Sequence, residues 1–129
     1  MSGKAIILYI EDNPDNRKLV SRILGAAGFT VHTANDGAAG LAYVEEHIPD
    51  LILVDLQLPE IDGLTVTRIL RTMARLQDVP IVALTANVLK EDREQSLAAG
   101  CNGFIQKPIS VDQLPLQIES YLTPTREPK

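Results

Sequence analysis

The chain has 129 residues and a mass of 14.1 kDa, which suits one domain with a buried core. Its net charge of −5 argues against the basic face that nucleic-acid binding requires, and no apolar stretch approaches the length of a membrane span. The N-terminus shows no signal-peptide pattern and Cys101 is the single cysteine, so we expect a cytoplasmic protein without a disulfide.

The first third of the chain predicts a strand, a helix and a second strand. Residues 5–10 form a fully apolar run, which is typical of a strand buried inside a parallel sheet. Asn13 and Pro14 predict the N-cap and first residue of a helix, and Gly28 predicts its left-handed end. Residues 29–34 are less apolar, which favours a strand near the edge of the sheet.

The central segment predicts a helix, a buried strand and another helix. Asp36 is expected to cap a second helix that Pro49 ends. Residues 51–54 are a second fully apolar run, and Asp55 stands at its carboxyl end. The Asp62-Gly63 pair predicts a turn into a third helix.

The last third predicts two more strands and two more helices. Residues 81–84 form a strand that ends in Thr85, and residues 103–105 form the last strand. Residues 90–99 predict a helix with a thin apolar stripe, which we expect to be the least firmly packed. Gly100 would cap it.

Ser110 and Gln113 resemble a capping box for the final helix, and Pro115 should bend or delay its first turn. Cys101 is expected to be a packed small hydrophobe, and His32 and His47 to lie at the surface. The side chains expected to be buried by the four helices other than the one over residues 90–99 are Val20, Ile23, Leu24, Ala27, Leu41, Val44, Ile48, Val66, Ile69, Leu70, Met73, Val111, Leu114, Ile118, Tyr121 and Leu122.

Five strands that alternate with five helices predict an α/β fold, a doubly wound five-stranded parallel sheet flanked by helices. The carboxyl ends of such strands lie at one edge of the sheet, where open α/β sheets bind their ligands. This edge would receive Glu11, Asp12, Asp55, Thr85 and Lys107. The sequence therefore predicts a site with three carboxylates, a hydroxyl and a lysine.

These residues carry a resemblance to a known family. Glu11-Asp12, Asp55, Thr85 and Lys107-Pro108, together with Leu58-Pro59 and Asp62-Gly63, resemble the receiver domain of two-component response regulators. The resemblance extends from Lys4 to about Leu122 and is nearest to stand-alone DivK-like regulators and hybrid-kinase receivers. It implies the CheY-like, flavodoxin-like strand order 2-1-3-4-5, a receiver domain over residues 1–122 and a short tail over residues 123–129.

The resemblance also implies a role for each site residue. Asp55 would accept a phosphoryl group from a sensor histidine kinase or a phosphotransfer protein. Mg²⁺ would be bound by Asp12, Asp55 and the backbone carbonyl of Gln57, with Glu11 acting through a water molecule. Two carboxylates ~4 Å apart repel by roughly 1 kcal/mol in water and about 4 kcal/mol at an intermediate dielectric, so a cation would stabilise the cluster.

Further residues would read the phosphoryl group. Lys107 and Thr85 would bind its oxygens, and the Lys107-Pro108 peptide bond would be cis. Phe104 stands where the family often has Tyr, and its ring could move between exposed and buried positions. Gln57 and Asn87 occupy the variable positions that flank the phosphoryl group.

The signal would leave through a protein-binding surface made of the fourth helix, the last strand and the last helix. We expect a downstream protein partner there, and no nucleic acid or membrane. The chain would be a phosphoacceptor that assists its own phosphorylation and dephosphorylation, not a turnover enzyme.

Three other classes of protein are alternatives to this interpretation. A flavodoxin-type FMN protein would need a phosphate cradle after the first strand, where Glu11, Asp12 and Asp15 would repel phosphate. A haloacid-dehalogenase-type phosphatase would need a second Asp at the position of Gln57. A receiver-fold interaction module that works without phosphorylation, or a receiver excised from a longer hybrid kinase or regulator, remains an open alternative.

Overall fold

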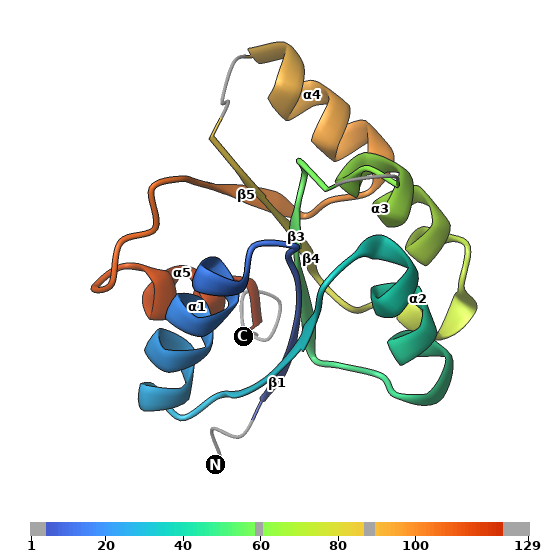
Figure 1. Cartoon of the computed structure of the whole chain (residues 1–129). Coiled ribbons are helices and arrows are strands. Elements are labelled where there is room, and N and C mark those ends of the chain that lie inside the picture. The colour runs from blue at the N-terminus through green and yellow to red at the C-terminus, as the bar shows by residue number, and fades with distance from the viewer. Residues whose placement is uncertain (1–4, 59–60, 87–89, 123–129) are drawn as a thin grey trace, which may run out of the picture.

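The structure is a computed structural model that describes residues 5–58, 61–86 and 90–122 (Figure 1). Its centre is a five-stranded parallel sheet in the order β2-β1-β3-β4-β5, which confirms the predicted topology. The strands are β1 (Ile6–Ile10), β2 (Thr30–Ala34), β3 (Leu51–Asp55), β4 (Ile81–Thr85) and β5 (Gly103–Gln106).

Helices cover both faces of the sheet. They are α1 (Pro14–Ala26), α2 (Gly37–Glu46), α3 (Gly63–Arg71), α4 (Lys90–Ala99) and α5 (Leu114–Leu122), with a short 3₁₀ helix η1 (Ala74–Leu76). Figure 1 shows α1 and α5 together on one face and α2, α3 and α4 on the other. No helix among these elements is long and apolar enough to cross a membrane within the part of the chain that the structure describes.

The sheet divides the core into two clusters. Successive side chains of a strand point to opposite faces, so β1 sends Ile7 and Tyr9 toward α1 and α5 and Leu8 and Ile10 toward the other layer. Every residue of β3 and β4 is buried, as expected for central strands between two helical layers. The site residues at the ends of these strands therefore rest on a rigid base.

The helix ends follow the predicted caps. The Asn13 and Asp36 side chains accept backbone N–H bonds from the first turns of α1 and α2, at 3.0 and 2.7 Å. Gly28 and Gly100 adopt φ values of 100° and 117°, as the left-handed ends of α1 and α4 require. Asp62, predicted only as part of a turn, is the N-cap of α3 and accepts the Thr65 N–H at 2.8 Å.

Three predicted core residues lie outside the helices and are exposed. Ala27 is the C-cap of α1, Ile48 follows the end of α2 and is 55% exposed, and Val111 precedes α5 and is 61% exposed. These predictions were wrong because the helical spacing of apolar residues continues past the ends of the helices. Caps and prolines, and not this spacing, set where the helices end. The late start of α5 is confirmed, since Pro115 fits into the first turn of a helix that begins at Leu114.

The fourth helix contributes little to the core. Ser96 and Ala99 are its buried side chains among residues 93–99, whereas Leu97 is 54% exposed. Cys101, just beyond it, is buried as predicted, with its sulfur 3.8 Å from the Thr67 hydroxyl. Burial raises the pKa of the Cys101 thiol, so the residue acts as a packed hydrophobe.

Candidate functional site

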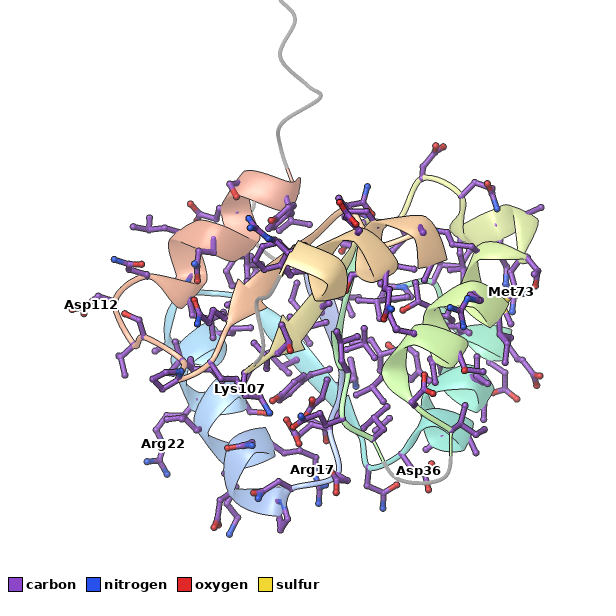
Figure 2. All side chains as sticks on the ribbon, turned by 90° about the horizontal axis from the view of Figure 1, so that it is seen from above. Arg17, Arg22, Asp36, Met73, Lys107 and Asp112 are labelled. Atoms are coloured by element: carbon purple, nitrogen blue, oxygen red, sulfur yellow. The ribbon has the colours of Figure 1, made fainter. Side chains whose placement is uncertain are left out.

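The carboxyl ends of the central strands bring the predicted site residues together. Glu11 and Asp12 follow β1, Asp55 ends β3, and Lys107 follows β5. Figure 2 views the molecule from above, with Lys107 labelled near the start of α1, which carries Arg17. Residues that are far apart in the sequence therefore meet at one edge of the sheet, as parallel strands require.

Asp55 is nearly fully buried and both of its oxygens are held. Oδ2 accepts a bond from Lys107 Nζ at 2.9 Å, and Oδ1 accepts the backbone N–H of Gln57 at 2.9 Å. Lys107 is itself partly buried, which strengthens the ion pair relative to one in water. The structure thus presents a fixed carboxylate beside a fixed cation.

Glu11 lies beside this pair and is also buried. Its Oε1 accepts the Tyr9 hydroxyl at 2.7 Å and lies 3.9 Å from Lys107 Nζ, while Oε2 accepts the Asn13 N–H at 3.2 Å. Arg17 donates to the Glu11 backbone carbonyl at 2.9 Å. Neither Tyr9 nor Arg17 was predicted from the sequence to belong to the site. The available signal was a phenol two residues before Glu11, and therefore on the same face of β1.

Burial sets the protonation of this network. It is the largest cause that raises the pKa of Glu11, and the neighbouring Asp55 raises it further, whereas the hydrogen bonds from Tyr9 and Asn13 lower it. Burial and the Glu11 carboxylate raise the pKa of Tyr9. Both effects favour the neutral phenol, the form that donates a hydrogen bond to Glu11.

Three carboxylates form a cluster that fits a hard cation. Oxygen atoms of Glu11, Asp12 and Asp55 all lie within 4.8 Å of one another. Asp12 is exposed while the other two are buried, so the cluster opens to solvent on the Asp12 side. Oxygen-only ligands with room for water suit Mg²⁺.

The remaining predicted residues lie on β4, on β5 and just after β3, except for Asn87. Thr85 ends β4, is buried, and accepts the Lys107 N–H through its backbone carbonyl at 2.8 Å. Phe104 is half-buried in β5, and Gln57 is exposed. The predicted cis peptide bond between Lys107 and Pro108 is present. Asn87 lies outside the described residues.

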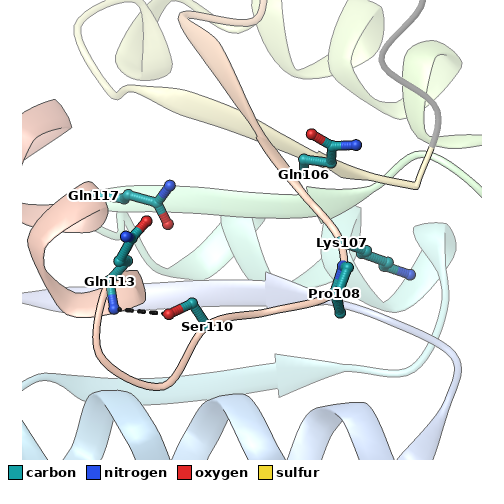
Figure 3. Close-up of a pocket in the computed structure, with 6 residues that line it drawn as sticks. All are labelled: Gln106, Lys107, Pro108, Ser110, Gln113 and Gln117. Carbon is teal, nitrogen blue, oxygen red and sulfur yellow. Dashed lines mark hydrogen bonds between the residues drawn. The ribbon is translucent and has the colours of Figure 1, made fainter.

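A pocket of about 430 Å³ lies beside the site (Figure 3). Its lining is polar and includes two site residues; it consists of Gln106, Lys107, Pro108, Ser110, Gln113 and Gln117. Figure 3 shows the Lys107 ammonium pointing away from Gln113 and Gln117. The pocket therefore lies between the end of β5 and the start of α5, next to the carboxylates.

Gly63 lets the start of α3 lie close against the backbone of Asp55 and Leu56. A Cβ at Gly63, the first residue of α3, would stand 2.5 Å from the Asp55 carbonyl oxygen and 2.7 Å from the Leu56 Cα. These are backbone atoms that cannot move aside by rotation. The sequence marked Gly63 as a turn residue and gave no sign of this close approach.

Gly63→Ala is therefore expected to destabilise the fold by about 1–3 kcal/mol through overpacking. Gly25→Ala is the matched control, because a Cβ at this exposed helical position meets nothing within 4 Å. It should stabilise the protein by up to about 1 kcal/mol through helix propensity. Urea unfolding of both variants measures the difference, and equal stabilities would contradict the close approach.

The comparisons with known proteins agree with this geometry. Residues 7–119 match the model of the response regulator receiver domain, and the chain belongs to this family. It is accordingly a domain of two-component phosphorelay signalling, a signalling protein instead of a classical turnover enzyme. The chain is 40% identical over 116 residues to the polar-differentiation response regulator DivK of Brucella ovis, covering 90% of this chain and 94% of DivK.

Solved structures show the same fold. The chemotaxis response regulator CheY4 of Vibrio cholerae matches with a TM-score of 0.89 and 28% identity, covering 92% of this chain and 99% of that one. The receiver domain of the sensor histidine kinase PA1611 of Pseudomonas aeruginosa PAO1 matches with a TM-score of 0.85 and 36% identity, covering 92% and 98%. That structure has a magnesium ion coordinated in its active site cleft.

Proposed function

We propose that Asp55 accepts a phosphoryl group from a phosphohistidine on a sensor histidine kinase or a phosphotransfer protein. The observation that carries this proposal is the buried Asp55 carboxylate at a strand end, with Lys107 Nζ at 2.9 Å. Phosphoryl transfer needs a positioned nucleophile and positive charge around the transferring oxygens. This site offers both.

In the proposed step, an Asp55 carboxylate oxygen forms a bond to phosphorus while the bond between phosphorus and the histidine nitrogen breaks. The imidazole leaves and the aspartate becomes an acyl phosphate. Lys107 exchanges its bond with Asp55 for one with a phosphoryl oxygen, as a point charge. The Thr85 hydroxyl donates to another phosphoryl oxygen.

The acidic cluster would hold Mg²⁺ through Asp12, Asp55 and the Gln57 backbone carbonyl, with Glu11 acting through a water molecule. When bound, the ion neutralises charge on the phosphoryl oxygens. The geometry that supports this assignment is the grouping of the three carboxylates within 4.8 Å.

The direct test is incubation of the purified chain with Mg²⁺ and acetyl phosphate, followed by borohydride trapping and mass spectrometry. Label at Asp55 would support the proposal. Absence of label with this donor and with a histidine kinase would favour the alternative, an interaction module that works without phosphorylation.

The proposal includes a cytoplasmic location and a receiver domain over residues 1–122.

We further propose that the signal leaves through the face formed by α4, β5 and α5. Phe104 on β5 is half-buried, and the Arg93 guanidinium of α4 lies 5.7 Å from its ring centroid. The weakly packed α4 is the helix that is easiest to rearrange. Thr85 and Lys107 flank this face. Their contacts with the phosphoryl group would exist only in the phosphorylated state. Phosphorylation would therefore stabilise one conformation of this face over the other, as a switch requires.

A beryllofluoride mimic is therefore expected to shift the amide NMR signals of residues 87–104 more than those of α1 and α2. Arg93→Ala should alter the Phe104 ring signals without the mimic, because it removes the contact above the ring. Heteronuclear spectra with and without the mimic provide the measurement. If the largest distant shifts fell on α1 and α2, the output face would lie elsewhere.

A further inference from the structure

We propose that Tyr9 is a positioning residue for phosphoryl transfer, which acts by holding Glu11 so that Lys107 stays available to Asp55. This inference rests on the proposed function of Asp55. Tyr9 is the fourth of the five residues of β1, two residues before Glu11, and is fully buried. In the sequence it is one more residue of an apolar strand.

The Tyr9 hydroxyl fixes one end of the Glu11 carboxylate. It donates to Glu11 Oε1 at 2.7 Å, while the Asn13 N–H donates to Oε2 at 3.2 Å. Both oxygens of the buried carboxylate therefore have donors that belong to β1 and the start of α1. A buried charge needs such partners, because burial without them is strongly unfavourable.

Lys107 is the competing donor for the same oxygen. Its Nζ lies 3.9 Å from Glu11 Oε1 and 2.9 Å from Asp55 Oδ2, so it makes its close contact with Asp55. Because Glu11 Oε1 already accepts a hydrogen bond from the Tyr9 hydroxyl, a bond from the Lys107 ammonium would stabilise Glu11 less. The hydroxyl thereby biases Lys107 toward the residue that receives the phosphoryl group.

Removal of the hydroxyl tests this competition with little change to the core. Tyr9→Phe keeps the ring among the buried side chains of the α1 and α5 face and deletes one oxygen. Glu11 Oε1 then lacks its neutral donor, and Lys107 is the nearby cation that can replace it. We expect Lys107 to shift toward Glu11 and away from Asp55.

Tyr121→Phe is the matched control. Tyr121 packs against the same core cluster, on α5, and its hydroxyl lies over Gly103 at the other end of β5 from Lys107. The substitution deletes the same atom from the same layer of the protein. Thermal unfolding of both variants accompanies each measurement, so that a loss of folding is recognised directly.

Two readouts separate positioning from packing. In metal-free protein, the Lys107 side-chain NMR signals should change in Tyr9→Phe and stay unchanged in Tyr121→Phe. With saturating Mg²⁺, Tyr9→Phe should slow phosphorylation by acetyl phosphate about tenfold, in line with the loss of one hydrogen bond to a charged group. Tyr121→Phe should react at the wild-type rate.

A double-mutant cycle with Glu11→Gln identifies the route of the effect. If Tyr9 acts through Glu11, Tyr9→Phe has no further effect on the Lys107 signals or on the rate in the Glu11→Gln background. Additive effects, or wild-type behaviour of Tyr9→Phe in both readouts, would overturn the inference. A wild-type chain that is never phosphorylated would refute the function of Asp55, while the Lys107 signals would still decide whether Tyr9 positions Glu11.

Discussion

Asp55→Asn is expected to abolish phosphorylation by acetyl phosphate and by a histidine kinase. The amide has the shape of the carboxylate and can still accept the Gln57 N–H through its oxygen. It is not a nucleophile toward phosphorus, however, and cannot form an acyl phosphate. Borohydride trapping and mass spectrometry should find no label in this variant, whereas the wild type carries it on Asp55.

The control for this experiment is Asp78→Asn. It makes the same chemical change at an exposed carboxylate in the segment that precedes β4, at the opposite end of the sheet. Its phosphorylation should equal that of the wild type. Label that persists unchanged in Asp55→Asn would show that another side chain is the acceptor.

Measuring the unfolding free energy of Asp55→Asn separates a loss of the nucleophile from a loss of folding. Asp55 and Glu11 are both buried, and the Asp55 carboxylate is one of the causes that raise the pKa of Glu11. Asp55→Asn removes the repulsion from Glu11 and also weakens the 2.9 Å contact with Lys107, two effects of opposite sign, so the metal-free variant should stay folded with a stability close to that of the wild type. A lost activity with retained stability then reports the chemistry of Asp55 and not a damaged fold.

The site could be predicted from sequence because its residues are tied to strand ends. Apolar runs located the strands; Asp55 and Thr85 followed two of them directly, and Lys107 came two residues after the last one. In a parallel sheet the carboxyl ends of the strands lie at one edge. This arrangement brings Lys107 Nζ within 2.9 Å of Asp55 Oδ2, although the two residues are 52 positions apart in the sequence. The assignment of a role to each residue depended on the family resemblance, since the spacing by itself gave only a cluster of charges.

The features that sequence reasoning missed depend on close contacts in three dimensions. Tyr9 looked like any other core residue of β1, because its hydroxyl matters only once Glu11 is placed beside it. Gly63 looked like a turn residue until the Asp55 backbone was found against it. Ile48 and Val111 fitted a helical period, but α2 ends before Ile48 and α5 begins after Val111.

Asp12→Ala is expected to weaken Mg²⁺ binding by at least about tenfold, a change of about 1.4 kcal/mol in binding free energy. The proposed metal site depends on anionic oxygens, and Asp12 supplies one from the exposed side of the cluster. Calorimetric titration of metal-free protein measures the affinity. Asp12→Asn should fall between the wild type and the alanine variant, because it keeps an oxygen ligand and loses the charge.

Thr85→Ala is the control for this titration. Thr85 is buried at the end of the neighbouring strand and would contact the phosphoryl group, so its loss should leave Mg²⁺ affinity close to that of the wild type. Thermal unfolding provides an independent measure. A ligand at 100 times its Kd stabilises the folded state by about 2.7 kcal/mol, and this Mg²⁺-dependent gain should shrink in Asp12→Ala alone. Equal Mg²⁺ affinity in the Asp12 and Thr85 variants would mean that the ion binds elsewhere, since removal of a direct anionic ligand cannot be without effect on the site that it forms.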